Sequence, residues 1–242
     1  MQIAVISMPA AGERRMQATQ QLHDLGLKFD FIDAVDGTAG TAMFSAVDVQ
    51  QHVLHTGRPP APGEIGCFAS HILAWRRCCE SNAPICVLED DFEAADFFPE
   101  ALAAAARWIS EYGFIRLQTE TRAKKVQVAQ SGDFVLHRYT KMAHSTLGYV
   151  IDPRVARCFI DASSVMLEPV DVFIKRFWNH RQPLYGLTPY AVWESSLSDT
   201  SIIEKRERSK KSMAVQIRRS ATRLGWFFRR VVFNLNHWNK RQ

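Results

Sequence analysis

Apolar residues near the start of the chain occur either in short continuous runs or at helical spacing. The run at residues 3–7 predicts a buried strand, residues 13–25 predict a helix, and residues 28–34 predict a second strand. A strand, a helix and a strand at this spacing are typical of a βαβ unit with a parallel sheet. Because ligands of such sheets bind at the carboxyl ends of the strands, we expect Ser7–Arg15 and Asp33–Gly37 to flank one crevice. The candidate core residues of the helix are Met16, Leu22 and Leu25.

The same alternation of patterns continues to about residue 200 and favours one α/β domain, with a mostly parallel sheet between helices. Helices are predicted over 62–75, from residue 97 or 98 to 112 with Asp96 as N-cap, from Pro153, and from Pro169. Strands are predicted at 85–88, 114–118, 125–129, 134–138, within 144–151 after a small-residue approach, and at 184–187, of which the third and fourth form a hairpin. Residues 38–62 have no clear pattern, and residues 189–198 are typical of a loop.

The end of the chain carries an amphipathic helical pattern. Its apolar stripe consists of Ile217, Ala221, Leu224, Phe228, Val231, Leu235 and Trp238. Residues 204–242 hold 12 Lys/Arg against 2 Asp/Glu, whereas the rest of the chain holds 18 against 23. A basic helix with aromatic residues on its apolar side predicts binding to an anionic membrane surface. Packing on the domain or on a partner is the alternative, and the acidic remainder argues against nucleic acid. The pattern therefore divides the chain into a domain at 1–203 and a tail at 204–242.

The composition excludes several classes of protein. An apolar content of 47% and a charged content of 23% are ordinary for a globular chain. The five cysteines show no metal-ligand spacing, and their odd number does not suit a complete disulfide framework. Cys67, Cys78 and Cys79 lie in or beside an apolar helix, so we expect buried free thiols there, which suits a reducing cytoplasm. The first residues do not resemble a signal peptide, and no apolar run has the length of a membrane span. His52 and His55 lack a third ligand nearby, so we expect them at the surface.

The predicted strand at 85–88 ends in three consecutive carboxylates, Glu89, Asp90 and Asp91. Like charges at one strand tip repel each other, and a divalent cation is the usual counterion. Mg²⁺ and Mn²⁺ prefer oxygen ligands and are often shared between carboxylates and substrate phosphates. Side chains alternate along an extended chain, so Glu89 and Asp91 point to one side and Asp90 to the other. We therefore predict that Glu89 and Asp91 hold the metal, although a solvated acidic turn would have the same sequence.

The helix before that strand reads Gly63-Glu64-Ile65-Gly66-Cys67 and continues through Ser70, His71 and Trp75. Together with Val87-Leu88-Glu89-Asp90-Asp91, these motifs resemble glycosyltransferase family 25 in order and spacing. The first strand, the Arg14-Arg15 pair, the turn at 34–37 and Val170-Asp171 are similar to the same family. The stretch 144–151 with the helix after it resembles the family's Gly-x-x-Tyr strand and following helix. The resemblance implies a GT-A-like α/β fold followed by the C-terminal amphipathic helix.

The resemblance also implies roles for individual residues. Asp171 is the first candidate for the catalytic base, and Glu64 and His71 are lesser candidates. Candidates for contacts with the nucleotide sugar are Ser7, Arg14, Arg15, Asp36, Ser70, Asp90, Thr146 and Gly148. Some of them have a structural explanation as well. A solvated helix face for either arginine, and packing or turn geometry for Thr146 and Gly148, are of about equal weight, and the helix dipole alone could account for Asp171.

The function implied is inverting transfer of a hexose, most simply galactose, from a nucleotide-diphosphate sugar such as UDP-galactose. The acceptor would be a lipopolysaccharide- or lipooligosaccharide-type, lipid-linked glycan, and Mn²⁺ or Mg²⁺ would neutralise the diphosphate. We expect the enzyme in the cytoplasm, peripheral on the cytoplasmic face of the inner membrane. The alternative is a non-catalytic nucleotide-sugar-binding protein or membrane-surface adaptor on a degenerate transferase fold. A metal-dependent phosphoesterase is less favoured because no second cluster of ligands is evident.

Overall fold

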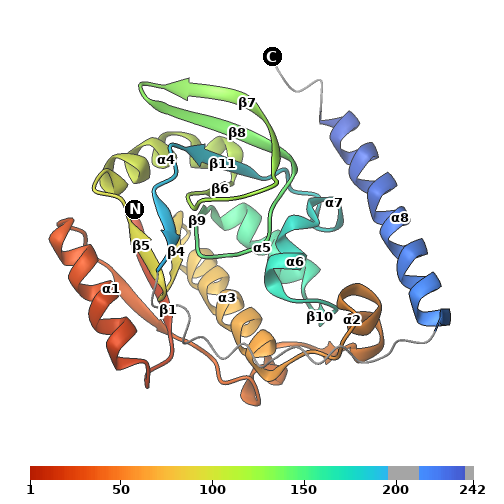
Figure 1. The fold of residues 1–242 in the computed structure, drawn as a ribbon. Helices are drawn as coiled ribbons and strands as arrows, with labels where there is room; N and C mark the ends of the chain where they lie inside the picture. Colours follow the sequence, from red (N-terminus) through yellow and green to blue (C-terminus); the bar gives the residue numbers. More distant parts are fainter. Residues whose placement is uncertain (196–212, 238–242) are drawn as a thin grey trace.

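A mixed sheet of eight strands forms the centre of the molecule in the computed structural model, which describes residues 1–195 and 213–237 (Figure 1). In spatial order the strands are β2 (Asp30–Asp33), β1 (Gln2–Ser7), β4 (Ile85–Glu89), β9 (Gly148–Ile151), β6 (Phe114–Arg116), β11 (Tyr185–Thr188), β8 (Phe134–Lys141) and β7 (Lys124–Ser131). Six strands run in one direction, and only β9 and β8 run in the other. The mostly parallel α/β sheet predicted from the sequence is confirmed.

Helices cover both faces of this sheet, because each central strand is apolar on both sides. Ile85 and Val87 of β4 belong to a core formed with α3 (Pro62–Ser81), α5 (Pro153–Ala162), α6 (Val170–Lys175) and α7 (Phe177–His180). Cys86 and Leu88 belong to a second core formed with α1 (Gly12–Asp24) and α4 (Phe98–Tyr112). The sheet is thus the middle of three layers, and the polar residues that end β1 and β4 lie together at one edge.

The chain between β2 and α3 is tied closely to the start of α3. This stretch contains η1 (Ala39–Met43), β3 (Ala46–Val47) and α2 (Val49–Thr56), and β3 pairs with β10 (Val165–Met166). A Cβ atom on Gly66 would overlap the carbonyl oxygen of Val35, and one on Gly37 would overlap that of Pro62. Ser70 accepts a hydrogen bond from the Val35 amide at 2.8 Å and donates to the Gly66 carbonyl at 2.7 Å. Close backbone approach explains these glycines.

The C-terminal helix α8 (Met213–Asn236) lies along the side of the domain, beside α2 and α7 (Figure 1). Its contacts come from one face: Trp226 packs on Arg176 and His55, and Phe233 packs on Phe177. Most of the predicted apolar stripe, as far as the described residues show it, faces away from the domain. It leaves Ile217, Leu224, Phe228 and Leu235 between 57% and 64% exposed. None of the described helices is both long and apolar enough to cross a membrane.

Several local expectations are wrong. Met16 is exposed, because the buried positions of α1 are Ala18 and Leu22. The side chain of Asp96 does not cap α4, whose N-cap position is Phe97. His52 is fully buried and its Nδ1 lies 2.9 Å from the Arg58 carbonyl oxygen, and His55 is largely covered by α8.

The expected loop at 189–198 contains β12 (Val192–Glu194), which pairs with β5 (Phe92–Ala94). So short a strand depends on this distant partner and is invisible in its own sequence. Residues 196–198, Trp238 and the boundary between 203 and 204 lie outside the described residues.

Candidate functional site

The three carboxylates that follow Leu88 have different surroundings. Glu89 accepts hydrogen bonds from His71 on α3, at 3.1 Å, and from Thr146, which precedes β9. Asp90 accepts from Ser7 at the end of β1, at 2.6 Å, and from Arg14 on α1, at 2.9 Å. Glu89 and Asp90 therefore bond to opposite layers of the fold, as the alternation of side chains predicts.

A buried chain of hydrogen bonds holds Glu89 in place. The Trp75 indole N–H donates a hydrogen bond to the Tyr149 hydroxyl at 2.9 Å. The Tyr149 hydroxyl in turn donates its proton to His71 Nδ1 at 2.8 Å. His71 then donates its Nε2 proton to Glu89. Burial raises the pKa of Glu89, but the hydrogen bonds from His71 and from the Thr146 hydroxyl outweigh it and leave the pKa below the ordinary value. Glu89 is held as a carboxylate.

Asp91 differs from Glu89 and Asp90 in its hydrogen bonding. Its Oδ1 atom is buried and has no hydrogen-bond partner among the described residues. Burial, reinforced by the charges of Glu89 and Asp90, raises the pKa of Asp91 to about 6. A buried carboxylate oxygen that lacks a donor is what a missing cation would leave, so this turn fits Mn²⁺ or Mg²⁺ with Glu89 and Asp91 as ligands. Asp90, paired with Arg14, is satisfied without a metal.

A different group of side chains near Glu89 offers softer ligands. Ligand atoms of Cys67, His71 and Glu89 lie within 4.8 Å of one another. Burial, followed by the nearby carboxylates, raises the pKa of the Cys67 thiol well above its usual value. A metal ligand must be the thiolate, so this group suits a hard cation less well than the pair of Glu89 and Asp91.

A pocket of about 250 Å³ opens beside Glu89 and is lined by Glu64, Ser145, Thr146 and Asp171 among others. It joins residues that are far apart in sequence and come from α3, β4, the chain before β9, and α6. Glu64 is already engaged, because Arg58 binds both of its carboxylate oxygens, at 2.7 and 2.5 Å. The Ala61 amide also donates to Glu64, at 3.0 Å, which fixes the start of α3. Asp171 lines the same pocket as Glu89, and its Oδ1 atom accepts a hydrogen bond from the Val172 amide at 2.7 Å.

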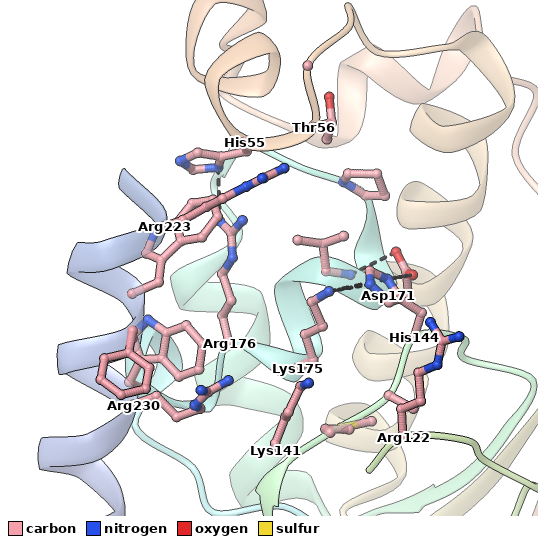
Figure 2. Close-up of a pocket in the computed structure, with 18 of the residues that line it drawn as sticks. His55, Thr56, Arg122, Lys141, His144, Asp171, Lys175, Arg176, Arg223 and Arg230 are labelled. Atoms are coloured by element: carbon pink, nitrogen blue, oxygen red, sulfur yellow. Dashed lines mark hydrogen bonds and ion pairs between the residues drawn. The ribbon is translucent and has the colours of Figure 1, made fainter. Parts of the chain in front are cut away.

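Asp171 forms a short polar chain with two residues that the sequence analysis did not single out. His144 Nδ1 donates to Asp171 Oδ2 at 2.8 Å, and the Lys175 ammonium lies 2.5 Å from His144 Nε2 (Figure 2). Burial raises the pKa of Asp171, but His144 and Lys175 outweigh it, so the pKa lies below its ordinary value. Burial, with the charges of Arg176 and Lys141, lowers the pKa of Lys175 to about 8. Asp171 is therefore ionised and able to accept a proton.

The loop that carries His144, Ser145 and Thr146 is held from inside the domain. The Arg116 guanidinium is fully buried and donates to the carbonyls of Ala143, His144 and Ser145 at 2.5 to 3.1 Å. Gln118 donates to the Ser145 hydroxyl at 2.7 Å, and Ser145 has φ of +89°. A non-glycine residue in this region is strained and needs such support. An arginine in the apolar stretch 114–117 was the available signal, since buried arginines are rare unless they are paired.

The other sequence candidates have partners within the fold. Arg15 donates to the Ser7 and Met8 carbonyls at 2.8 and 3.1 Å, whereas Arg14 reaches Asp90 with a partly exposed side chain. Asp36 is exposed and accepts from the amide and hydroxyl of Thr38, which lowers its pKa. Gly148 is buried, and a Cβ atom there would stand 3.1 Å from Leu88, so packing alone explains it. Ser70 and His71 are also fully buried and line neither pocket.

Comparison with known proteins places this arrangement in a family. Residues 1–174 match glycosyltransferase family 25, described as an LPS biosynthesis protein family. Procollagen galactosyltransferase 1-B of Xenopus laevis is 29% identical over 193 residues, which cover 72% of this chain and 30% of that protein. The lacto-N-neotetraose biosynthesis glycosyltransferase LgtE of Neisseria gonorrhoeae is 28% identical over 208 residues, with coverage of 78% and 72%.

LgtB of Neisseria meningitidis is 29% identical over 207 residues, with coverage of 78% and 74%. The match thus spans under a third of the procollagen enzyme but most of each neisserial relative. Since the family match covers residues 1–174, which include both Glu89 and Asp171, the chain belongs to glycosyltransferase family 25.

Proposed function

We propose that this chain is a metal-dependent, inverting glycosyltransferase that moves a hexose, most simply galactose, from a nucleotide-diphosphate sugar such as UDP-galactose. The observation that carries the proposal is the pocket lined by both Glu89 and Asp171. Two residues after Glu89, the buried Oδ1 atom of Asp91 has no hydrogen-bond partner among the described residues. The family and its relatives named as galactosyltransferases or lacto-N-neotetraose glycosyltransferases support the donor and a lipopolysaccharide-type glycan acceptor.

The residues divide into two sides. Glu89 and Asp91 would hold Mn²⁺ or Mg²⁺, which supplies charge neutralisation for the departing diphosphate. Ser7 and Arg14 lie at the same sheet edge as Glu89, where ligands of α/β sheets bind, and Arg14 has donors for a phosphate beyond those given to Asp90. Asp171, across the pocket, removes the acceptor hydroxyl proton, and one base on that side is sufficient for inversion.

His144 and Lys175 support this role of Asp171. His144 orients the carboxylate through its Nδ1 proton, and Lys175 keeps it ionised through its positive charge. His71 acts from behind Glu89 as a positioning residue, since its ring is buried and both nitrogens are hydrogen-bonded.

Transfer can be tested directly with the purified chain. UDP-hexoses are incubated with a lactose- or glucosamine-terminated oligosaccharide and MnCl₂, and the product is analysed by mass spectrometry and by NMR of the new anomeric centre. We expect Asp91→Asn and Asp171→Asn to lower kcat at least a hundredfold. Asp133→Asn, in the exposed hairpin turn, is the matched control. Donor binding without transfer to any acceptor would instead support the non-catalytic adaptor. Hydrolysis of simple phosphate esters would support the phosphoesterase alternative.

We also propose that α8 binds an anionic membrane surface, which places the protein on the cytoplasmic face of the inner membrane. The exposed stripe of Ile217, Leu224, Phe228 and Leu235 is a large apolar area for a solvent-facing helix. Arg218 and Arg229 are exposed on α8 and do not line the cavity next to the domain, so they can meet lipid phosphates.

Vesicle co-sedimentation tests this proposal. The chain should bind vesicles containing phosphatidylglycerol more strongly than pure phosphatidylcholine vesicles, and the double variant Leu224→Ser and Phe228→Ser should lose most of that binding. Met16→Ser removes an equally exposed apolar side chain from α1 and should leave binding unchanged. Self-association of the wild-type chain that the double variant abolishes, with no vesicle binding, would show that a second copy covers the stripe instead.

A further inference from the structure

A second cavity, of about 1510 Å³, lies between α8 and the domain. In Figure 2, Arg223 and Arg230 project into it from α8, while Lys175 and Arg176 come from α6 and its end and Lys141 from the end of β8. Eight lysine and arginine residues line this cleft, against three carboxylates, Glu64, Glu120 and Asp171. Such an excess of one sign in a partly enclosed space creates a strong positive potential.

Internal ion pairs account for only part of the positive charge. Arg58 is paired with Glu64, Arg176 with Glu168, and Lys175 contacts His144 beside Asp171. The five others have no ion-pair partner among the described residues: Arg122, Lys141, Arg219, Arg223 and Arg230.

Arg219 is the clearest of these five. Its Nε–H is buried without a hydrogen-bond partner among the described residues. A buried donor on a charged group is costly to leave unpaired, so the cleft is built to receive hydrogen-bond acceptors that carry negative charge.

The cleft continues into the small pocket. Both cavities are lined by Glu64, Pro169 and Asp171. A ligand in the cleft therefore extends to the carboxylate that we assign as the base, whereas Ser7 and Arg14, on the proposed donor side, line neither cavity. Because the cleft reaches Asp171 but not Ser7 or Arg14, it suits the acceptor rather than the donor.

We infer that this cleft binds the acceptor through phosphate substituents on the saccharide. Guanidinium groups such as those of Arg219 and Arg223 recognise phosphate by paired hydrogen bonds. The inference rests on the proposed function, because it names the substrate class of the same site. The apolar stripe of α8 faces away from the cleft, so one helix serves two partners: its exposed face the membrane, and its inner face the charged part of the acceptor.

Binding of small probes tests the cleft independently of transfer. Isothermal titration at low salt compares glucose 6-phosphate, glucuronate, glucose, inorganic phosphate and a single-stranded DNA oligomer. We expect glucose 6-phosphate to bind more tightly than inorganic phosphate or glucuronate, and glucose not to bind. The double variant Arg219→Gln and Arg223→Gln should weaken glucose 6-phosphate at least tenfold.

The matched control is Arg218→Gln with Arg229→Gln, which removes the same charge from the same helix outside the cleft. This control variant should keep glucose 6-phosphate binding and lose vesicle binding. The cleft variant should lose glucose 6-phosphate binding and keep vesicle binding. Circular dichroism and thermal melting confirm that both variants retain the fold.

The inference would be overturned if both variants lost glucose 6-phosphate affinity equally, or if glucose bound as tightly as glucose 6-phosphate. Binding of the DNA oligomer and of none of the sugar phosphates would overturn it as well. In transfer assays with a phosphorylated acceptor, the cleft variant should raise the acceptor KM about tenfold and leave kcat and donor KM near wild type. If the cleft variant transfers sugar as well as the wild type, the role of the cleft in acceptor binding would be refuted, and the proposed function would stand. If the chain binds phosphosugars but transfers no sugar from any donor, the cleft inference would stand and the proposed function would be refuted.

Discussion

Replacement of Asp91 by asparagine should make the metal-free protein more stable at neutral pH, although it removes a proposed metal ligand. Burial beside Glu89 and Asp90 raises the pKa of Asp91 from 3.8 to about 6. A raised pKa in the folded state means that folding favours the protonated acid. The carboxyl group therefore costs nothing below about pH 4. The cost grows as the pH rises through 6, and it is constant above that.

The size of the effect follows from the shift. A difference of about two pKa units corresponds to about 3 kcal/mol at ~1.4 kcal/mol per unit. In EDTA at pH 7.5 we expect Asp91→Asn to raise the free energy of unfolding by up to about 3 kcal/mol, or several degrees in Tm. At pH 4 the two proteins should be nearly equal. Asparagine has the same shape without the charge, so the gain reflects the carboxylate alone.

Urea denaturation followed by circular dichroism measures the free energy of unfolding of both proteins, without metal in EDTA and with metal in MnCl₂. Mn²⁺ should stabilise the wild type at pH 7.5 and leave the variant unchanged, because a cation binds the ionised carboxylate and offsets its burial. Asp133→Asn serves as the control in the exposed hairpin turn. A variant that is less stable than wild type in EDTA at pH 7.5, or a difference that does not change with pH, would refute the reasoning.

Three further substitutions test the parts of the fold that support the site. Gly66→Ala should lower the free energy of unfolding by about 2 kcal/mol or more, because the new methyl group overlaps a backbone carbonyl, whereas Gly12→Ala, in open space, should be nearly neutral in urea denaturation. Thr146→Val removes a hydrogen bond to Glu89 and should weaken Mn²⁺ about tenfold by electron paramagnetic resonance; unchanged affinity would separate Thr146 from the metal site. Arg116→Met leaves three carbonyls without their donor and should speed amide exchange at 143–147, and slow exchange there would show that the loop holds itself.

The alternation of side chains in a strand was enough to foresee that Glu89 and Asp90 point to opposite layers of the fold. The order of apolar runs and helical spacings likewise predicted the three-layer α/β fold, because these periodicities are local properties of the chain. The motifs around Gly66, His71 and Glu89 carried the family, and the structure explains them by a tight loop-to-helix contact and a carboxylate held by hydrogen bonds. The sequence also located Asp171 in the first turn of a helix.

Other features required the tertiary structure, because they depend on residues far apart in the chain. His144 meets Asp171 only because Arg116, from another strand, holds the loop that carries it. β12 exists only through its pairing with β5. The amphipathic pattern of α8 predicted a helix but not which face would pack. The rings of Trp226 and Phe233 contact Arg176 and Phe177 of the domain, and most of the longer apolar stripe faces outward. Periodicity fixes which residues share a face, and only the shape and charge of the opposing surface decide which face is buried.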